Sequence, residues 1–452
     1  MIRLSLSETA SAISGQLNGS DSVFKGVSVD SRTLKSGQLF IAIKGEKNDG
    51  HSVLEDVKNK GGVGAIVNSL STRIKMPQIV VKDSIKSLGD LAHFWRKNFT
   101  VKVIGITGSV GKTTVKEMLG TIIKQVGNPL VSEGNYNNEI GVPLTLLKLS
   151  NEINFVVLEM GAAKPGDIKY LSELALHDVG IITKCSPAHL SGFGNLETIA
   201  RTKGEILALP KDGVAILNKN DAFFPFWSAI VKKYYCQILS FGDGADVWAG
   251  NIVDNDYGMS FDLNIFEETM RTTLNFLGRH NIDNALAAAT AARALGISPK
   301  KISQGLMSAV PMNGRMQLKK GKGNYDVIDD SYNSNPASLA AAMLFFSSIE
   351  GPKWLVLGDM KELGEKESSF HFEALSYANT LGFQKVFTIG PCFKKAGKEI
   401  DISNQHFESN DNLLLFLQES LRNKTSKVSI LFKGSRAMEL NKIVDFLVED
   451  NR

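Results

Sequence analysis

The sequence predicts an α/β protein of three domains. A chain of 452 residues exceeds what one hydrophobic core usually supports, and its length favours about three domains. Apolar strands alternate with longer helical segments from residue 101 to about residue 312, and a second alternating series follows. Residues before 99 carry only short apolar runs. We therefore expect a small N-terminal α/β domain at 1–98, a central domain with a mostly parallel sheet at 99–312 and a C-terminal Rossmann-like α/β domain at 313–452.

The first domain is predicted from the short runs “GQLFIAI” and “GVGAIVN” and from the helical pattern of “SIKSLGDLAHFWRKNF”. The N-terminus lacks the cationic start and uninterrupted apolar stretch that are typical of an export signal. No apolar run approaches the roughly 18 residues that a membrane-spanning helix needs. We therefore expect a cytoplasmic protein that does not enter a membrane.

The central domain is predicted from four strongly apolar runs, “VKVIGI”, “NFVVLEM”, “DVGIITK” and “GVAILN”, with helical segments between them. Such strands are typical of a parallel sheet that helices cover on both faces. The alanine-rich “HNIDNALAAATAARALG” closes this domain. The C-terminal domain is predicted from four further apolar runs with helices between them, “NYDVIDD”, “KWLVLGD”, “QKVFTIG” and “KVSILFKG”. In parallel sheets ligands bind at the carboxyl ends of the strands, so the residues that follow each run matter most.

A phosphate-binding loop is predicted in “GITGSVGKTT”, where a strand enters a glycine-rich turn and then a helix. The generic pattern requires glycine at Ile106, so the match is incomplete. The strand-to-helix context still places backbone N–H groups and a helix N-terminus around phosphate. We expect Lys112 to contact the phosphates and Thr113 to bind Mg²⁺, which makes this a phosphate-loop ATPase domain.

Three further residues are candidates for the same site because they follow or lie near these strands. Glu159 ends a buried strand, and a carboxylate there is a plausible Mg²⁺ ligand beside Thr113. A carboxylate that merely reaches water is the alternative. His189 follows the next strand, and Lys203 lies in the helical “NLETIARTKGEILAL”. From the pattern alone these two are more typical of a loop histidine and a solvated lysine.

A guanine-specific GTPase is an alternative that “VAILNKND” raises, because Asn218, Lys219 and Asp221 match the spacing of a guanine-binding motif. The loop glycine of such GTPases is replaced by Ile106, and Glu159-Met160-Gly161 stands where their second motif is expected. These departures argue against that class.

Charge and cysteine content argue against nucleic-acid binding, membrane binding and a disulfide framework. The net charge is only +4, and the charged residues are mixed throughout, which indicates neither nucleic-acid nor membrane binding. Three scattered cysteines favour free thiols over a disulfide framework.

Taken in chain order, several segments resemble the Mur ligases, ATP-dependent enzymes that build the peptide of bacterial cell-wall precursors. These segments include “DSRTLKSGQLFIAIKGEKNDGHSV”, “NYNNEIGVPLTLL”, “LEMGAAKPGDI”, “RHNIDNALAA”, “DDSYNSNPASLAAA” and “FKGSRAMELNKIV”. The family's phosphate loop has the form Thr-Gly-x-x-Gly-Lys-Thr, which makes Ile106 ordinary.

The resemblance implies roles for residues that the patterns leave open. It implies two Mg²⁺ ions, with a site formed by Thr113, Glu159, His189 and Lys203, the last as a carbamate. It implies catalytic roles for Lys112, His189 and Lys203. Implied ATP contacts are Thr107, Gly108, Ser109, Val110, Gly111, Lys112, Thr113, Thr114, His280, Asn281, Arg315 and Asp330. Implied substrate contacts are Ser31, Arg32, Asp49, His51, Asn137, Asn138, Asn333 and Asn335.

Within the family the segments most resemble the ligases that join D-alanyl-D-alanine to UDP-N-acetylmuramoyl-tripeptide. The resemblance implies an acyl-phosphate intermediate, with UDP-MurNAc-pentapeptide, ADP and phosphate as products, and a monomer. The main alternative is the ligase that adds a diamino acid to the dipeptide precursor. That relative, when it selects diaminopimelate, carries an Asp-Asn-Pro-Arg motif, whereas the comparable stretch here is Pro391-Cys392-Phe393. Folylpolyglutamate-type ligases share the central fold but should lack the first domain.

Overall fold

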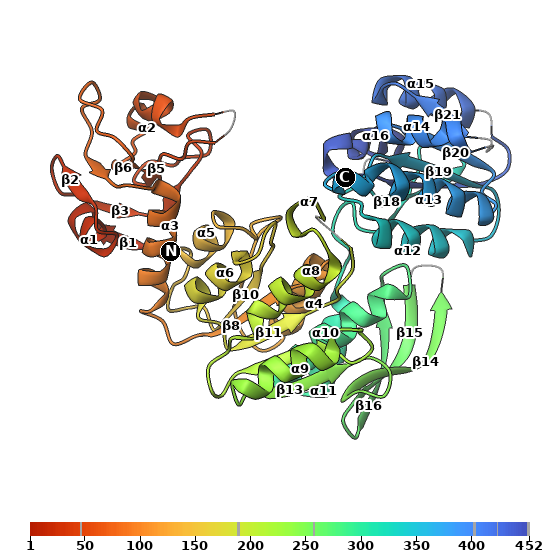
Figure 1. Cartoon of the computed structure of the whole chain (residues 1–452), viewed down its shortest axis with the longest axis horizontal. Coiled ribbons are helices and arrows are strands. Elements are labelled where there is room, and N and C mark those ends of the chain that lie inside the picture. Colours follow the sequence, from red (N-terminus) through yellow and green to blue (C-terminus); the bar gives the residue numbers. More distant parts are fainter. Residues whose placement is uncertain (46–47, 188–189, 256–257, 401–403, 423, 450–452) are drawn as a thin grey trace.

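The computed structural model describes residues 1–449, apart from 46–47, 188–189, 256–257, 401–403 and 423 (Figure 1). Three lobes, each built around its own sheet, follow one another along the chain (Figure 1). The predicted α/β fold is confirmed.

The N-terminal lobe contains a five-stranded sheet and a two-stranded antiparallel pair. The larger sheet has the order β2 (Gln16–Asn18), β7 (Gln78–Val80), β6 (Gly64–Val67), β5 (Leu39–Ile41) and β4 (Val27–Ser28). The pair consists of β1 (Arg3–Ser5) and β3 (Val23–Lys25). The helices of the N-terminal lobe are α1 (Leu6–Ala12), η1 (Gly50–Val53), α2 (Leu54–Asn59) and α3 (Ser84–Arg96).

The helix α3 attaches this lobe to the central one. Asp83 caps its first turn by accepting the N–H groups of Ile85 and Lys86. At its other end the buried Arg96 guanidinium donates to the carbonyls of Ala175 at 3.0 Å and Phe99 at 2.7 Å. The guanidinium therefore holds the linker between the lobes against the central lobe.

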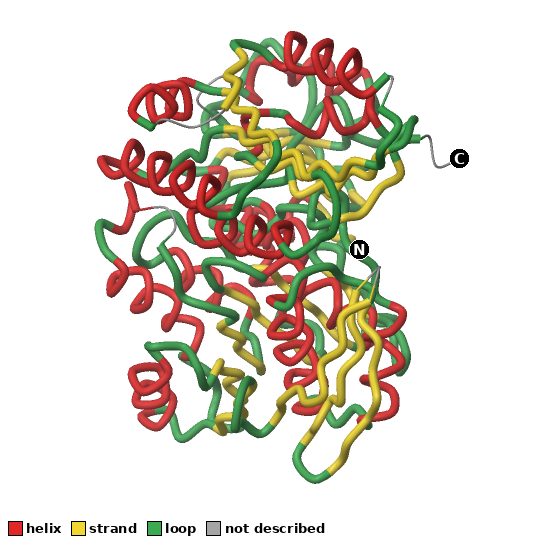
Figure 2. The backbone as a smooth tube through the Cα atoms, turned by 90° about the vertical axis from the view of Figure 1, so that its right-hand side faces the viewer, coloured by secondary structure: helices red, strands yellow, loops and turns green. Residues whose placement is uncertain are grey.

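The central lobe is built on a nine-stranded sheet that is parallel except at one end. Its order is β16 (Glu268–Leu274), β15 (Gly258–Ile265), β14 (Val247–Asn255), β13 (Gln237–Phe241), β12 (Val214–Asn218), β11 (Val179–Ile182), β8 (Lys102–Thr107), β10 (Phe155–Glu159) and β9 (Pro129–Val131). The antiparallel strands β14, β15 and β16 project at the lower right of Figure 2.

Helices cover both faces of this sheet, as expected. Along β8, Val103 packs into one apolar cluster and Ile104 into another, which shows that successive side chains enter separate cores. The central helices are α4 (Lys112–Ile123), α5 (Gly141–Leu146), α6 (Asp167–Ala175), α7 (Leu190–Phe193), α8 (Leu196–Gly204), η2 (Glu205–Leu207), α9 (Phe224–Lys233), α10 (His280–Ala294) and α11 (Pro299–Ser308).

The C-terminal lobe has a six-stranded sheet in which only β17 is antiparallel to its neighbour. The order is β17 (Gln317–Lys320), β18 (Tyr325–Asp330), β22 (Val428–Lys433), β19 (Lys353–Gly358), β20 (Lys385–Ile389) and β21 (Asn404–Phe407). Its helices are α12 (Pro336–Ser347), η3 (Gly364–Lys366), α13 (Glu367–Thr380), α14 (Pro391–Glu399), α15 (Asn410–Leu421), η4 (Arg436–Met438) and α16 (Leu440–Leu447).

The three cysteines are free thiols, as predicted. Among the residues that the structure describes, none of the helices combines the length and the apolar character needed to cross a membrane.

Candidate active site

A cavity of about 1240 Å³ lies where the three lobes meet. Its walls include the carboxyl ends of β8 and β10 in the central lobe and of β18 and β22 in the C-terminal lobe. From the N-terminal lobe, Asp83, Ile85 and Lys86 contribute. Two parallel sheets therefore present their ligand-binding edges to one space.

The phosphate loop forms one wall of the cavity. Gly108 and Gly111 have φ values of 149° and 85°. A Cβ at Gly108 would lie 1.9 Å from Thr183 Oγ1, and one at Gly111 would lie 2.3 Å from Asn284 Oδ1, so both positions require glycine. The Lys112 ammonium donates to the Gly108 carbonyl at 2.7 Å. Ser109 and Val110 lie in the turn, Thr107 ends β8 before it, and Thr113 and Thr114 lie in the first turn of α4 after it.

Ile106 lies inside β8 and is fully buried in the apolar core. The turn begins only after Thr107, whose hydroxyl donates to the Met160 carbonyl at 2.8 Å. The position that departs from the generic pattern is therefore a core position of the strand, where glycine would leave a void.

Thr113 and Glu159, the predicted metal-binding pair, are in direct contact. The Thr113 hydroxyl donates to Glu159 Oε2 at 2.8 Å, and Asn137 Nδ2 donates to Oε1 at 2.8 Å. Glu159 is buried at the end of β10, yet it lines the cavity. Adjacent hydroxyl and carboxylate oxygens facing a cavity are donors that fit Mg²⁺.

Lys203 lies on the same cavity, at the end of α8. It is buried, and burial followed by the nearby positive charge of Lys112 lowers its pKa to about 7. Its ammonium lies 5.9 Å from the centre of the Phe193 ring. No described residue forms a hydrogen bond or ion pair with it. His189, the other predicted metal ligand, lies outside the described residues.

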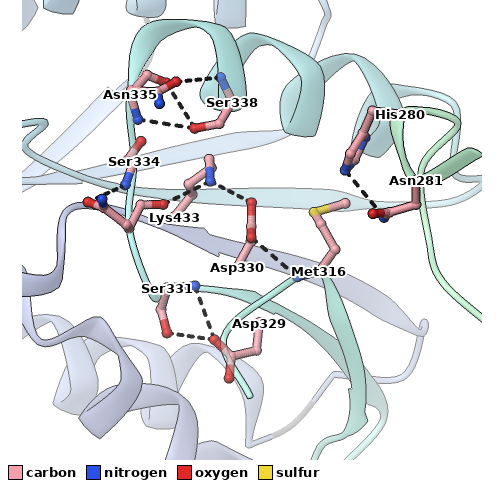
Figure 3. Close-up of polar contacts among 11 residues, drawn as sticks. His280, Asn281, Met316, Asp329, Asp330, Ser331, Ser334, Asn335, Ser338 and Lys433 are labelled. Atoms are coloured by element: carbon pink, nitrogen blue, oxygen red, sulfur yellow. Dashed lines mark hydrogen bonds and ion pairs between the residues drawn. The ribbon is translucent and has the colours of Figure 1, made fainter. Parts of the chain in front are cut away.

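Asp330 and Lys433 form the facing wall in the C-terminal lobe (Figure 3). Lys433 Nζ donates to Asp330 Oδ2 at 2.6 Å and to the Asn333 carbonyl at 3.1 Å, and Met316 N–H donates to Asp330 Oδ1. Asn335 caps α12 through a reciprocal pair of bonds with Ser338. The predicted contacts Asp330, Asn333 and Asn335 all line the cavity.

His280 and Asn281 begin α10 and also line the cavity (Figure 3). Their side chains lie 3.3 Å apart, between His280 Nε2 and Asn281 Nδ2. Asn281 also donates to the Leu277 carbonyl and accepts from Asn284 Nδ2, each at 2.8 Å. Burial lowers the pKa of His280. This pair therefore presents a neutral imidazole beside a fixed amide.

Arg315 lies on the connector between the second and third lobes and lines the cavity. Its guanidinium stacks 4.3 Å from the centre of the Tyr332 ring, and Arg436 approaches the same ring at 5.6 Å. Burial is the main cause that lowers the pKa of Lys112, and the charge of Arg315 lowers it further. Arg315 and the phosphate loop line the same cavity.

Known proteins match this chain over its whole length. Family models match residues 23–96 (Mur ligase family, catalytic domain), 106–292 (Mur ligase middle domain) and 314–436 (Mur ligase, glutamate ligase domain). The chain belongs to the Mur ligase family. Together the three matched ranges leave residues 1–22, 97–105, 293–313 and 437–452 uncovered.

Two relatives that match this chain over nearly its whole length share one name. UDP-N-acetylmuramoyl-tripeptide--D-alanyl-D-alanine ligase of Escherichia coli is 35% identical over 100% of this chain and 99% of its own length. The Bacillus subtilis enzyme of that name is 34% identical over 99% of both chains. Among solved structures, MurF from Acinetobacter baumannii has a TM-score of 0.92 at 33% identity, covering 99% of each chain. MurF ligase from Thermotoga maritima in complex with ADP has a TM-score of 0.82 at 27% identity, over 93% of this chain and 96% of that one.

Four predicted substrate contacts of the first lobe lie away from the residues that line the cavity: Ser31, Arg32, Asp49 and His51. Arg32 pairs with Asp30 through bonds of 2.9 and 2.7 Å, which holds the pKa of Asp30 at about 2. His51 Nδ1 bonds Asp49 at 2.7 Å, and its Nε2 accepts the Asn68 N–H at 3.0 Å. Their role in binding the uridine nucleotide stays a prediction. Sequence reasoning missed Asp83, Ile85 and Lys86.

In the segment that matches a guanine-binding motif, Lys219 and Asp221 form hydrogen bonds to nearby loops. Asp221 accepts the backbone N–H groups of Cys185 at 2.8 Å and Phe223 at 2.9 Å, and Lys219 donates to the Gly244 carbonyl. The Asp221 carboxylate thus holds two loops together. These contacts do not support a role in binding guanine.

A buried group of Asp359, His371 and Cys392 in the C-terminal lobe resembles a metal site only by composition. Both Asp359 oxygens accept N–H groups at the start of α14, and His371 Nε2 accepts the Met360 N–H at 2.9 Å. Burial raises the pKa of the Cys392 thiol to about 12. The single lone pair of His371 Nε2 is therefore already in use, and Cys392 is a protonated thiol at neutral pH and not a thiolate ligand.

Proposed function

We propose that this protein is an ATP-dependent ligase that joins D-alanyl-D-alanine to UDP-MurNAc-tripeptide and releases ADP and phosphate. Full-length relatives at 34–35% identity carry that name, and a structural neighbour is described with ADP. The observation that carries the proposal is the single cavity, which the phosphate loop, the Thr113–Glu159 pair, Lys203 and both outer lobes line together.

The first step activates the terminal carboxylate of the tripeptide. A carboxylate oxygen attacks the γ-phosphorus of ATP, the bond from that phosphorus to the bridging oxygen breaks, and ADP leaves. Lys112 and the N-terminus of α4 offset the negative charge of the phosphates. Thr113 and Glu159 would hold Mg²⁺, which when bound neutralises charge on the transferring oxygens.

The second step forms the amide. The free amine of D-alanyl-D-alanine attacks the acyl carbon, the tetrahedral intermediate expels phosphate, and the amine loses a proton. Because water would hydrolyse an acyl phosphate, the closing of the outer lobes around the cavity protects it. Arg315 lies at the connector, where it would reach phosphate as the C-terminal lobe closes.

Lys203 would serve as a carbamate that helps to hold a second Mg²⁺ with His189. An amine with a pKa of about 7 is neutral in a large fraction at neutral pH. A neutral amine can attack CO₂, which gives a carbamate and releases a proton. The new negative charge would lie beside Lys112, whose cation now disfavours an ammonium at Lys203.

The remaining assignments follow the domain order. Residues 1–98 would bind the uridine nucleotide, 99–312 would bind ATP, and 313–452 would bind the dipeptide and part of ATP. We infer that the protein works in the bacterial cytoplasm, because both substrates are precursors of cell-wall synthesis, and that it is a monomer, as the family resemblance implies.

The test is phosphate release from ATP with UDP-MurNAc-tripeptide present and with D-alanyl-D-alanine added or omitted. The proposal predicts release only when the dipeptide is present. Release that ignores the dipeptide, prefers GTP, or instead requires UDP-MurNAc-dipeptide with a diamino acid would refute it.

A further inference from the structure

Lys116 is a buried lysine that the reaction described above does not use. Its side chain has 0% exposure although it lies on α4, only one turn after the phosphate loop. Burying an ammonium group is costly unless polar partners replace its water. The contacts that compensate Lys116 therefore indicate what the residue does.

These contacts lead to the loop that follows β9. Lys116 Nζ donates to the Ser132 carbonyl at 2.7 Å and to the Gly134 carbonyl at 3.3 Å. Its one carboxylate partner, Glu117 at 3.0 Å, is 37% exposed. One turn further along α4, a Cβ at Gly120 would lie 2.9 Å from Val131 Cγ2, so the helix and β9 approach closely. Lys116 thus joins the phosphate-loop helix to the start of residues 132–138, called here the asparagine loop.

The asparagine loop in turn fixes the candidate metal ligand. Ser132 Oγ accepts the Glu159 N–H at 3.0 Å, and Asn137 Nδ2 donates to Glu159 Oε1 at 2.8 Å. The Asn137 carbonyl accepts the Gly161 N–H at 2.7 Å. Glu159 Oε2 is left to Thr113. Lys116 therefore holds the asparagine loop at its start, and Asn137 near the other end of the same loop contacts the Glu159 carboxylate.

We propose that Lys116 is a positioning residue, which holds the asparagine loop so that Asn137 orients Glu159 for Mg²⁺. The inference rests on the proposed function in taking Glu159 as a metal ligand. Residues behind the direct ligands commonly change metal affinity by 10- to 100-fold when they are replaced. A lysine that only stabilised the fold would leave metal affinity unchanged.

The experiment measures the Mg²⁺ concentration at which binding of AMP-PNP is half-maximal, together with the unfolding temperature without nucleotide. We expect Lys116→Met and Asn137→Ala each to raise that concentration about 10-fold, and the double variant to raise it no further. Lys116→Arg, which keeps charged N–H donors, should recover part of the loss. Lys124→Met replaces the exposed lysine that follows α4 and should match the wild type.

Two results would overturn the proposal: a lower unfolding temperature for Lys116→Met with unchanged Mg²⁺ dependence, or effects that multiply in the double variant. If Lys116→Met does not fold, Asn137→Ala tests the proposal. Unchanged Mg²⁺ dependence in that variant would show that Asn137 does not orient Glu159 for Mg²⁺, which would overturn the proposal. Failure of the wild type to bind AMP-PNP with Mg²⁺ would instead contradict the proposed function.

Discussion

Three lysines, Lys116, Lys203 and Lys433, are buried in different surroundings. Lys433 is paired with the Asp330 carboxylate, and Lys116 donates to backbone carbonyls. Lys203 has no such partner among the described residues. Because burial disfavours a charge that nothing offsets, the pKa of Lys203 falls to about 7. The protonation of Lys203 therefore changes near neutral pH.

A pH dependence of stability follows for Lys203. The unfolded chain keeps this proton up to the ordinary pKa of 10.5, whereas the folded chain loses it near 7. Burial of Lys203 therefore destabilises the folded chain. This destabilisation has its full size below pH 7 and becomes smaller as the pH rises from about 7 towards 10.5. We expect Lys203→Met to unfold at least about 2 °C above the wild type at pH 7, and the gap to narrow towards pH 10. Thermal unfolding in carbonate-free buffer measures it, and a gap that does not change with pH would contradict the pKa.

At the scale of elements, the strand–loop–helix unit of β8 and α4 could be predicted because all its signals are local. Apolar runs identify the strands, and the ends of parallel strands identify Glu159 and Thr113 as neighbours. The pairing of Asp330 with Lys433 joins positions 103 residues apart, and no local pattern predicts it. The buried state of Lys116 and Lys203 also depends on packing between elements. For the same reason, the N-terminal helix α3 was missed as a wall of the cavity.

The geometry of the phosphate loop predicts the effect of Gly111→Ala. At φ 85° with Asn284 Oδ1 2.3 Å from the added Cβ, alanine is both strained and obstructed. We expect the free energy of unfolding to fall by more than about 1 kcal/mol and AMP-PNP binding to weaken, since the loop N–H groups must shift.

Gly166→Ala is the matched control, because Gly166 has φ 89° but no atom within 4 Å of an added Cβ. It should show the strain without the loss of nucleotide binding. Urea unfolding and AMP-PNP titration compare the two variants. Equal nucleotide affinity in both would show that Asn284 does not restrict the loop.

For the whole molecule, the arrangement of the lobes explains why the site is assembled from distant segments. Arg96 and Trp95, which donates to the Leu149 carbonyl at 3.2 Å, fasten the first lobe to the central one. The third lobe is reached through the connector that carries Arg315, whose ring partner Tyr332 belongs to that lobe. Under the proposed function, ATP and both peptide substrates would meet in the cavity that all three lobes line.

The most direct test of this account follows an oxygen atom. When the terminal carboxylate of UDP-MurNAc-tripeptide is labelled with ¹⁸O, one carboxylate oxygen must leave with the released phosphate, because it bridges carbon and phosphorus in the acyl phosphate. Mass spectrometry should therefore find ¹⁸O in the phosphate that forms when ATP and D-alanyl-D-alanine are present. Phosphate without the label, released while the pentapeptide product forms, would contradict the account.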